Sequence, residues 1–218
     1  MTLEDYYRRR AKEYDEQIYC RTDPLRQNEL EQIGNAMKEK LKGRRVLELA
    51  CGPGYWTRIL SDVALDIVAT DAVREMVDIA KTKNFNCSTS FVLNDAYQTS
   101  FQNGSFEGGM ANFWFSHVPK SRIHTFLAEF HRVLQNKSRV FMVDNVYVPG
   151  IGGQLVAKKG DENTYKLRTA GDGSKDLVLK NYYQADELVK IFSHYVESFA
   201  EKNVFCGNYF WFVAYDVQ

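Results

Sequence analysis

Residues 45–57 read RVLELACGPGYWT, and this stretch decides the fold. Residues 45–50 form a short apolar run of the kind that becomes a buried strand, and the glycine turn 51–54 follows directly. Residues 55–62 then continue with the character of a helix. Glycines let the backbone approach a ligand closely, and the first turn of a helix presents free N–H groups. The stretch therefore predicts a strand, a ligand-binding turn and a helix.

The same alternation continues along the chain. Residues with helical spacing begin at Val73, and residues 121–134 predict a strong amphipathic helix. Further strands are expected at residues 65–70, 90–93, 109–113 and 139–147, with two closing strands near 196–202 and 209–215. Apolar strands that alternate with helices are typical of a parallel sheet covered on both faces. The predicted fold class is α/β, a doubly wound, mostly parallel seven-stranded sheet.

Three segments depart from this rhythm. The Tyr-rich start of the chain predicts a helix, and Asp23 followed by Pro24 predicts the start of a second one. The segment after residue 149 is rich in Gly, Lys and Asp and predicts an inserted loop or hairpin. We expect one domain over residues 1–218. Its parts are a helical lid (1–42), a cofactor-binding core (43–149), an insertion (150–183), and a C-terminal helix with strands (184–218).

Composition excludes several classes of protein. In 218 residues, 28 Lys and Arg balance 28 Asp and Glu, so the net charge of zero gives no bulk attraction to nucleic acid or anionic membranes. No uncharged run reaches the roughly 18–20 residues of a membrane helix. The start of the chain lacks the apolar segment of a signal peptide. The four cysteines form no CxxC motif and indicate free thiols. We expect a cytoplasmic protein with no nucleic-acid or membrane partner.

Acidic side chains accompany the ends of three predicted strands. They are Glu48, Asp71 and Asp95. Carboxyl ends of parallel strands meet at one edge of a sheet, where Asp71 could accept hydrogen bonds from a ribose and Asp95 from an adenine amino group. The turn lacks the third glycine of the dinucleotide fingerprint, and Glu48 would repel a pyrophosphate. The pattern favours an uncharged nucleoside with a cationic tail over a nicotinamide cofactor.

Four segments in this order resemble the motifs of class I S-adenosylmethionine-dependent methyltransferases. They are VLELACGPGYWT (46–57), VATDAVREMVDIAK (68–81), LNDAY (93–97) and MANFWFSHVP (110–119). The resemblance covers residues 44–147 by motif. It implies a Rossmann-like methyltransferase fold, with S-adenosylmethionine as cofactor and S-adenosylhomocysteine as product. It also implies in-line methyl transfer to an O, N, C or S atom of a small molecule. A non-catalytic cofactor-binding domain of the same fold is the alternative.

The resemblance also implies site residues. The cofactor-binding set is Tyr14, Glu48, Ala50, Gly52, Gly54, Asp71, Ala72, Met76, Asp95, Ala96, Asn112 and Phe113. The substrate candidates are Tyr19, Trp114, His117 and Tyr147, and Tyr6, Tyr14 and Tyr19 are candidates for a lid. His117 is the candidate catalytic residue, because an imidazole after the fourth strand could accept a proton from a hydroxyl or ammonium nucleophile. A structural histidine is the other interpretation.

A metal site is the remaining alternative. Residues 140–150 (VFMVDNVYVPG) resemble the fifth-strand segment of catechol-type O-methyltransferases, in which an Asp-Asn pair binds a divalent cation. The pair here would be Asp144 and Asn145. Those enzymes need a further Asp where this sequence has Asn112, so we predict no metal. The histidines at 117, 124 and 131 are spaced too widely for a zinc site. Arg8, Arg9 and Arg10 are expected on a solvated helix face.

Overall fold

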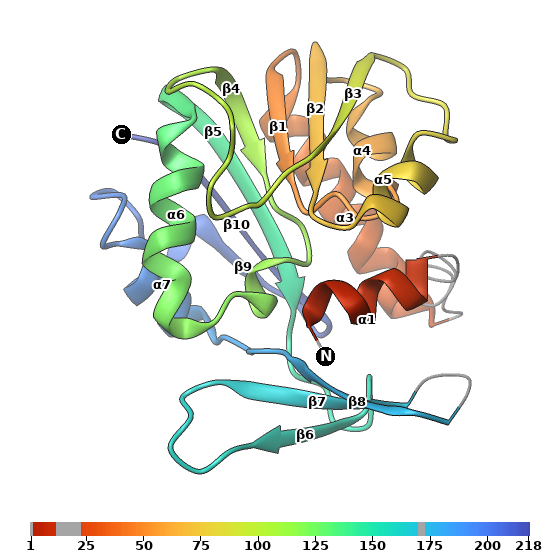
Figure 1. Cartoon of the computed structure of the whole chain (residues 1–218). Coiled ribbons are helices and arrows are strands. Elements are labelled where there is room, and N and C mark those ends of the chain that lie inside the picture. Colours follow the sequence, from red (N-terminus) through yellow and green to blue (C-terminus); the bar gives the residue numbers. More distant parts are fainter. Residues whose placement is uncertain (1, 12–22, 170–172) are drawn as a thin grey trace.

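The computed structural model describes residues 2–11, 23–169 and 173–218. A seven-stranded sheet in the order β3-β2-β1-β4-β5-β10-β9 forms its centre (Figure 1). Its strands are β1 (Arg45–Leu49), β2 (Asp66–Asp71), β3 (Ser88–Leu93), β4 (Phe106–Met110), β5 (Leu134–Asn145), β9 (Val204–Cys206) and β10 (Phe210–Asp216). The first five pair in parallel, β10 runs antiparallel to β5, and β9 runs antiparallel to β10. The predicted fold class is confirmed.

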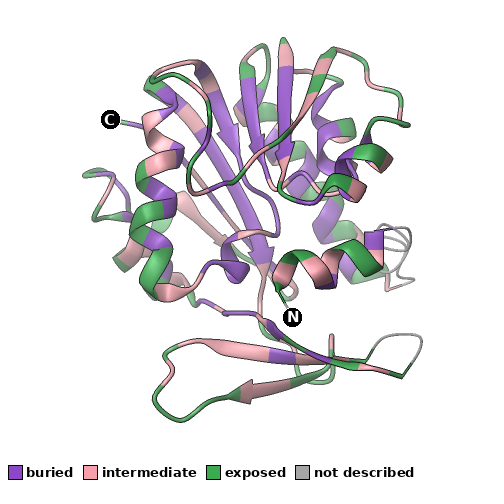
Figure 2. Ribbon diagram, in the orientation of Figure 1, coloured by how far each residue is buried: buried purple, intermediate pink, exposed green. Residues whose placement is uncertain are grey.

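Helices cover both faces of this sheet. They are α1 (Leu3–Arg10), α3 (Pro24–Leu41), α4 (Tyr55–Leu60), α5 (Arg74–Ala80), α6 (Ile123–Arg132) and α7 (Ala185–Phe192). One buried cluster joins α6 and α7 to the sheet, and a second joins α3 and α4 to it. Figure 2 shows the buried residues concentrated along the central strands. The helix start predicted at Asp23 is confirmed, because its carboxylate accepts hydrogen bonds from the N–H groups of Leu25 and Arg26.

A second, smaller sheet lies beyond the carboxyl ends of the parallel strands. It comprises β6 (Gln154–Ala157), β7 (Thr164–Thr169) and β8 (Lys175–Leu179), which pair antiparallel. The insertion expected at residues 150–183 is thus a three-stranded sheet. Helix α1 lies between it and the main sheet (Figure 1). An ion pair of 2.5 Å between Arg9 and Asp176 joins α1 to β8. These two elements therefore enclose the edge at which ligands are expected.

The structure corrects some of the expected boundaries. The strand expected at residues 196–202 is wrong: Val196 and Phe199 are buried in turns, and the short 3-10 helix Glu201–Asn203 precedes β9. Strand β4 ends at Met110, so Asn112 and Phe113 follow it. Helix α6 ends at Arg132, and Leu134 already belongs to β5.

Two further expectations concern cysteines and membranes. The thiols of Cys51, Cys87 and Cys206 are free, and Cys20 lies outside the described residues. Among the residues that the structure describes, no helix is both long enough and apolar enough to cross a bilayer.

Candidate active site

A cavity of about 250 Å³ opens where β1, β2, β3 and β4 end. The glycine turn forms one part of its wall, and Leu3, Glu4 and Tyr7 of α1 form another. Eleven predicted site residues line it: Ala50, Gly52, Asp71, Ala72, Met76, Asp95, Ala96, Asn112, Phe113, Trp114 and His117. The fold thus brings most of the predicted set to a single cavity, which we call the strand-end cavity.

Asp71 ties the glycine turn to the end of β2. Its carboxylate accepts one hydrogen bond from the Gly52 N–H at 2.9 Å and another from the Val73 N–H at 2.8 Å. Burial raises the pKa of this carboxyl group above its usual value. A carboxylate offers about four lone-pair positions, so Asp71 keeps the capacity to accept hydrogen bonds from a ligand.

Two residues of the cavity wall have a strained backbone. Ala50 (φ 54°) and Phe113 (φ 59°) adopt the left-handed conformation, which residues with a Cβ rarely adopt. Each follows the end of a strand, β1 or β4. Hydrogen bonds from the Cys51 N–H to the Thr70 carbonyl and from the Phe113 N–H to the Val143 carbonyl hold these positions. Such strain concentrates at ligand sites, where the surrounding structure fixes it.

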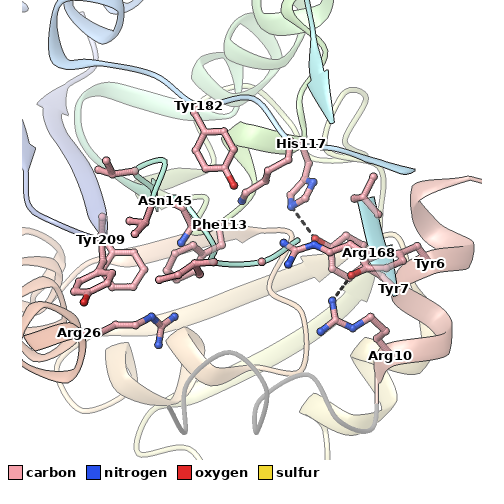
Figure 3. Close-up of a pocket in the computed structure, with 17 residues that line it drawn as sticks. Tyr6, Tyr7, Arg10, Arg26, Phe113, His117, Asn145, Arg168, Tyr182 and Tyr209 are labelled. Atoms are coloured by element: carbon pink, nitrogen blue, oxygen red, sulfur yellow. Dashed lines mark hydrogen bonds between the residues drawn. The ribbon is translucent and has the colours of Figure 1, made fainter. Parts of the chain in front are cut away.

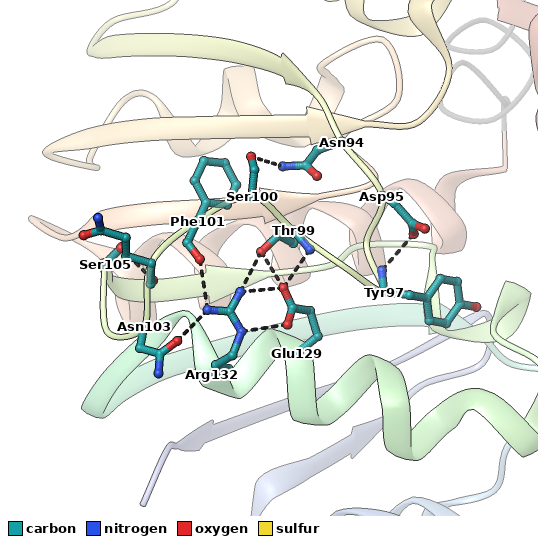
Figure 4. Close-up of polar contacts among 11 residues, drawn as sticks. Asn94, Asp95, Tyr97, Thr99, Ser100, Phe101, Asn103, Ser105, Glu129 and Arg132 are labelled. Atoms are coloured by element: carbon teal, nitrogen blue, oxygen red, sulfur yellow. Dashed lines mark hydrogen bonds and ion pairs between the residues drawn. The ribbon is translucent and has the colours of Figure 1, made fainter.

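The loop that carries Asp95 is fastened to α6. Asp95 accepts a hydrogen bond from the Tyr97 N–H at 2.8 Å. Further along, Glu129 of α6 accepts hydrogen bonds from the Thr99 N–H and hydroxyl at 2.7 and 2.6 Å (Figure 4). The Arg132 guanidinium beside Glu129 lowers the pKa of that carboxyl to about 2, so the anchor stays charged. This anchor positions the third strand end against the cavity.

Asn112 presents an unused acceptor in the cavity wall. Its side chain is buried, and its Oδ1 has no hydrogen-bond partner in the described part of the chain. Its Nδ2 lies 3.4 Å from the Met37 sulfur. A buried carbonyl oxygen without a donor is uncommon, and at a cavity it indicates a ligand that donates a hydrogen bond. The oxygen fits a cofactor that carries an ammonium group.

Glu48 and Gly54 do not line the strand-end cavity. Glu48 is buried and accepts a hydrogen bond from the Thr57 hydroxyl at 2.5 Å, and burial raises its pKa to about 8. Gly54 is the N-cap of α4 with φ 83°, and a Cβ there would lie 3.2 Å from the Cβ of Ala80. The structure therefore gives Gly54 a packing role between α4 and α5.

A second pocket adjoins the first and shares Tyr7, Phe113 and His117 with it. It lies between α1, the end of β5 and the insertion, and we call it the insertion pocket (Figure 3). Its charged lining residues are Arg10, Arg26, Arg168 and Lys180, and its tyrosines are Tyr6, Tyr7, Tyr182 and Tyr209. Among the described residues that line it there is no carboxylate.

His117 stands at the junction with both ring nitrogens engaged. Its Nδ1 lies 2.7 Å from the Leu179 carbonyl oxygen, which can only accept, so Nδ1 carries the proton. Burial lowers the His117 pKa to about 3, so the ring is neutral. Its Nε2 therefore accepts a hydrogen bond from the Tyr7 hydroxyl at 2.7 Å. This geometry suits a residue that positions α1 better than the proton acceptor expected from the sequence.

In the pair Asp144 and Asn145, the alternative metal site, the carboxylate is already bound by other groups of the protein. Oδ1 of Asp144 lies 2.9 Å from the Lys180 ammonium, and its Oδ2 accepts a hydrogen bond from the Ser116 N–H at 2.8 Å. Burial favours the neutral acid, but Lys180 outweighs it and the pKa of Asp144 is lowered. A buried ammonium already neutralises this carboxylate, so the geometry favours the prediction of no metal over the alternative in which Asp144 and Asn145 bind a cation. Lys180 is distant in sequence, so no local motif announced it.

The remaining predicted residues lie elsewhere. Tyr147 lines neither cavity and packs instead against Tyr182, with ring centroids 5.3 Å apart. Tyr14 and Tyr19 lie outside the described residues. His124 and His131 form hydrogen bonds with the hydroxyls of Tyr195 and Tyr215, as structural histidines do.

Sequence reasoning missed several lining residues. The most important are Tyr7, Arg10, Arg26, Arg122, Arg168, Lys180, Tyr182 and Tyr209. The sequence predicts a solvated helix face for Arg10, whereas the structure places it in the insertion pocket. For Tyr7, Arg10 and Arg26 the available signal was the accumulation of tyrosine and arginine in residues 1–42, and no local pattern indicated the others.

Comparisons with known proteins agree with this geometry. Residues 46–137 match the family model of a methyltransferase domain. No curated protein sequence matches the chain. A structure of DhpI with S-adenosylhomocysteine is similar, with a TM-score of 0.73, 23% identity, and coverage of 97% of this chain and 93% of that one.

Two further solved structures are similar to the chain. DhpI with SAM and a ligand designated HEP gives a TM-score of 0.75 at 22% identity, covering 96% of this chain and 94% of that one. A SAM-dependent methyltransferase from Aquifex aeolicus gives 0.60 at 17% identity, covering 97% and 98%. At these identities the likenesses establish a shared fold over nearly the whole described chain.

Proposed function

We propose that the chain is a class I S-adenosylmethionine-dependent methyltransferase and that it methylates a small molecule bound in the insertion pocket, since residues 46–137 match the family model of a methyltransferase domain. The observation that carries the proposal is the wall that the two cavities share. Tyr7, Phe113 and His117 line both, so a cofactor in one and an acceptor in the other would meet at these residues.

The strand-end cavity supplies the groups that S-adenosylmethionine requires. Asp71 would accept hydrogen bonds from the ribose, and Asp95 with Ala96 would face the adenine. Asn112 Oδ1, which lacks a donor among the described residues, would accept from the ammonium of the methionine part. The DhpI complex with SAM and HEP holds a cofactor and a second ligand in a chain of the same fold, which supports a site for two molecules.

Alignment is the main task left to the protein. The bound cofactor supplies an electrophilic methyl group on a sulfonium. The chain would orient the acceptor and exclude water through α1 and the insertion, which enclose the pocket. Orientation of this kind contributes roughly 7–11 kcal/mol toward lowering a barrier. In this proposal His117 holds α1 in place through Tyr7.

Calorimetric titration with S-adenosylhomocysteine tests the cofactor site. Asp71→Asn should weaken binding about 10- to 100-fold, because it removes charge from hydrogen bonds to the ribose. Asp78→Asn is the matched control, since Asp78 is exposed on α5 and lines neither cavity. Absence of binding by the unaltered protein at millimolar ligand would overturn the proposed function. Equal affinities for the two variants would refute the role of Asp71.

A further inference from the structure

We infer that the methyl acceptor is an oxyanion, a carboxylate or a phosphate-type oxygen, and that Arg168 is the residue that selects it. The inference rests on the proposed function and specifies the substrate class of the same site. Its basis is the charge of the insertion pocket, which four cationic side chains line together with four tyrosines and, among the described residues, no carboxylate. A cavity of this composition binds anionic groups most favourably.

Arg168 is the side chain of this pocket best placed to bind an anion. It belongs to β7, and the structure gives its guanidinium no hydrogen bond or ion pair with any described residue, while its Nε is buried. A Cβ on Gly152 would lie 2.6 Å from an Arg168 terminal nitrogen, so the absence of a side chain at Gly152 makes room for this group. A guanidinium presents donors in a fork that matches a carboxylate or phosphate group.

Carboxylates near the pocket are already engaged with other groups. Asp144 pairs with Lys180 at 2.9 Å, and Asp176 pairs with Arg9 at 2.5 Å. Asp176 stands opposite Arg168 in the pairing of β7 with β8, but its ion pair is made with α1. Neither of these two carboxylates therefore forms an ion pair with Arg168.

Proton chemistry at the junction points to the same class of substrate. Both nitrogens of His117 have protein partners, and burial raises the pKa of Tyr182 to about 12. A neutral hydroxyl or an ammonium acceptor needs a group that removes its proton. No such group lines the described pocket. An oxyanion is already ionised at neutral pH and attacks without one.

The reaction then balances without a base. An oxygen lone pair of the acceptor forms the new O–C bond to the methyl group as the C–S bond breaks, and its electron pair remains on sulfur. The products are a methyl ester and neutral S-adenosylhomocysteine, and no proton is released. The acceptor loses one negative charge, so the ester is attracted to Arg168 less than the substrate is. This difference favours product release.

Binding of anions to the protein saturated with S-adenosylhomocysteine provides the first test. Phenylphosphonate and benzoate are the phosphonate and carboxylate probes, and benzyl alcohol is the neutral probe. We expect saturable binding of at least one anion and about 10- to 100-fold weaker binding by Arg168→Gln. Lys175→Gln removes the same charge from an exposed site on β8 and should bind like the unaltered protein. Arg168→Lys should restore part of the affinity if the charge, rather than the fold, is responsible.

Transfer of a labelled methyl group provides the second test, using the same probes with phenols, amines and thiols added. Label in a methyl ester whose formation depends on Arg168 supports the inference. A base-labile product identifies the carboxylate, and a base-stable monoester that co-migrates with methyl phenylphosphonate identifies the phosphonate. If S-adenosylhomocysteine binds but no anion does, or if only neutral acceptors are methylated and Arg168→Gln matches Lys175→Gln, the inference fails while the proposed function stands. Failure to bind S-adenosylhomocysteine would instead remove the proposed function.

Discussion

Glu48 differs from most carboxyl groups because its native state favours the protonated form. Burial raises its pKa to about 8 from 4.5, so the folded protein keeps it neutral at pH 7 while the unfolded chain ionises it. The free energy of unfolding therefore depends on pH through this group. Its contribution is fully present below the pKa of the unfolded chain, 4.5, and is lost progressively as the pH rises to about 8. At pH 7 the free energy of unfolding is lower by on the order of 3 kcal/mol than it is at low pH, as far as this group is concerned.

Glu48→Gln should remove this pH dependence. Its amide oxygen can still accept the hydrogen bond from Thr57, but it cannot ionise. Urea unfolding at about pH 5 and about pH 8 should show a smaller fall in unfolding free energy for this variant than for the unaltered protein. Glu31→Gln, at an exposed position of α3, serves as the control. Parallel pH profiles for all three proteins would contradict the assignment.

Among single residues of the site, those at the carboxyl ends of the parallel strands could be predicted from the sequence. Asp71 and Asp95 were predicted to meet because parallel strands bring their carboxyl ends to one edge, and both line the strand-end cavity. Arg168 could not be predicted in this way. It comes from a separate sheet, and only the folded chain places it near His117, whose pKa it lowers.

Between elements, the buried pair of Lys180 and Asp144 joins the end of β5 to the segment after β8. Both side chains are nearly inaccessible, and the Lys180 ammonium also donates to the Ser116 hydroxyl at 2.5 Å. Lys180→Met should destabilise the protein by about 3–5 kcal/mol, because it leaves a buried carboxylate without its counter-ion. Chemical denaturation measures this loss.

The double variant separates loss of charge pairing from loss of packing. Lys180→Met combined with Asp144→Asn removes both charges and should recover a large part of the lost stability. Lys175→Met, on the exposed side of β8, should have little effect. If the double variant is as unstable as the sum of the single variants, the pair does not act as a coupled unit, and its role in joining the insertion to the core is refuted.

Elements were predictable where one local pattern decides them. The alternation of apolar strands and amphipathic helices located β1 to β5 to within a few residues, and all of these except the edge strand β3 are buried along most of their length. The pattern failed at residues 196–202, where Val196 and Phe199 are buried without pairing in a sheet. It also predicts only a loop or hairpin for the insertion, since burial hardly alternates along β6 and β7 and only the five-residue β8 alternates clearly.

For the whole molecule, zero net charge and a cationic pocket together define how salt should act. With 28 positive and 28 negative residues, the chain has no excess charge to attract an anion from a distance. An anionic acceptor would therefore be held by local contacts in the insertion pocket. In the proposed function, S-adenosylmethionine would instead be held by Asp71, Asn112 and backbone groups of the strand-end cavity, so the two ligands should respond to salt differently.

Steady-state kinetics with an anionic acceptor can measure this difference. Raising NaCl from about 0.02 to about 0.5 M, which shortens the Debye length several-fold, should raise the KM of the acceptor about threefold or more and change that of S-adenosylmethionine less than about twofold. Sodium sulfate at matched ionic strength should raise the acceptor KM further, because a divalent oxyanion also competes for Arg168. In Arg168→Gln this additional effect of sulfate should disappear. If both KM values rise in parallel, or sulfate and chloride act alike on the unaltered protein, salt acts by screening alone and Arg168 does not form a specific anion site.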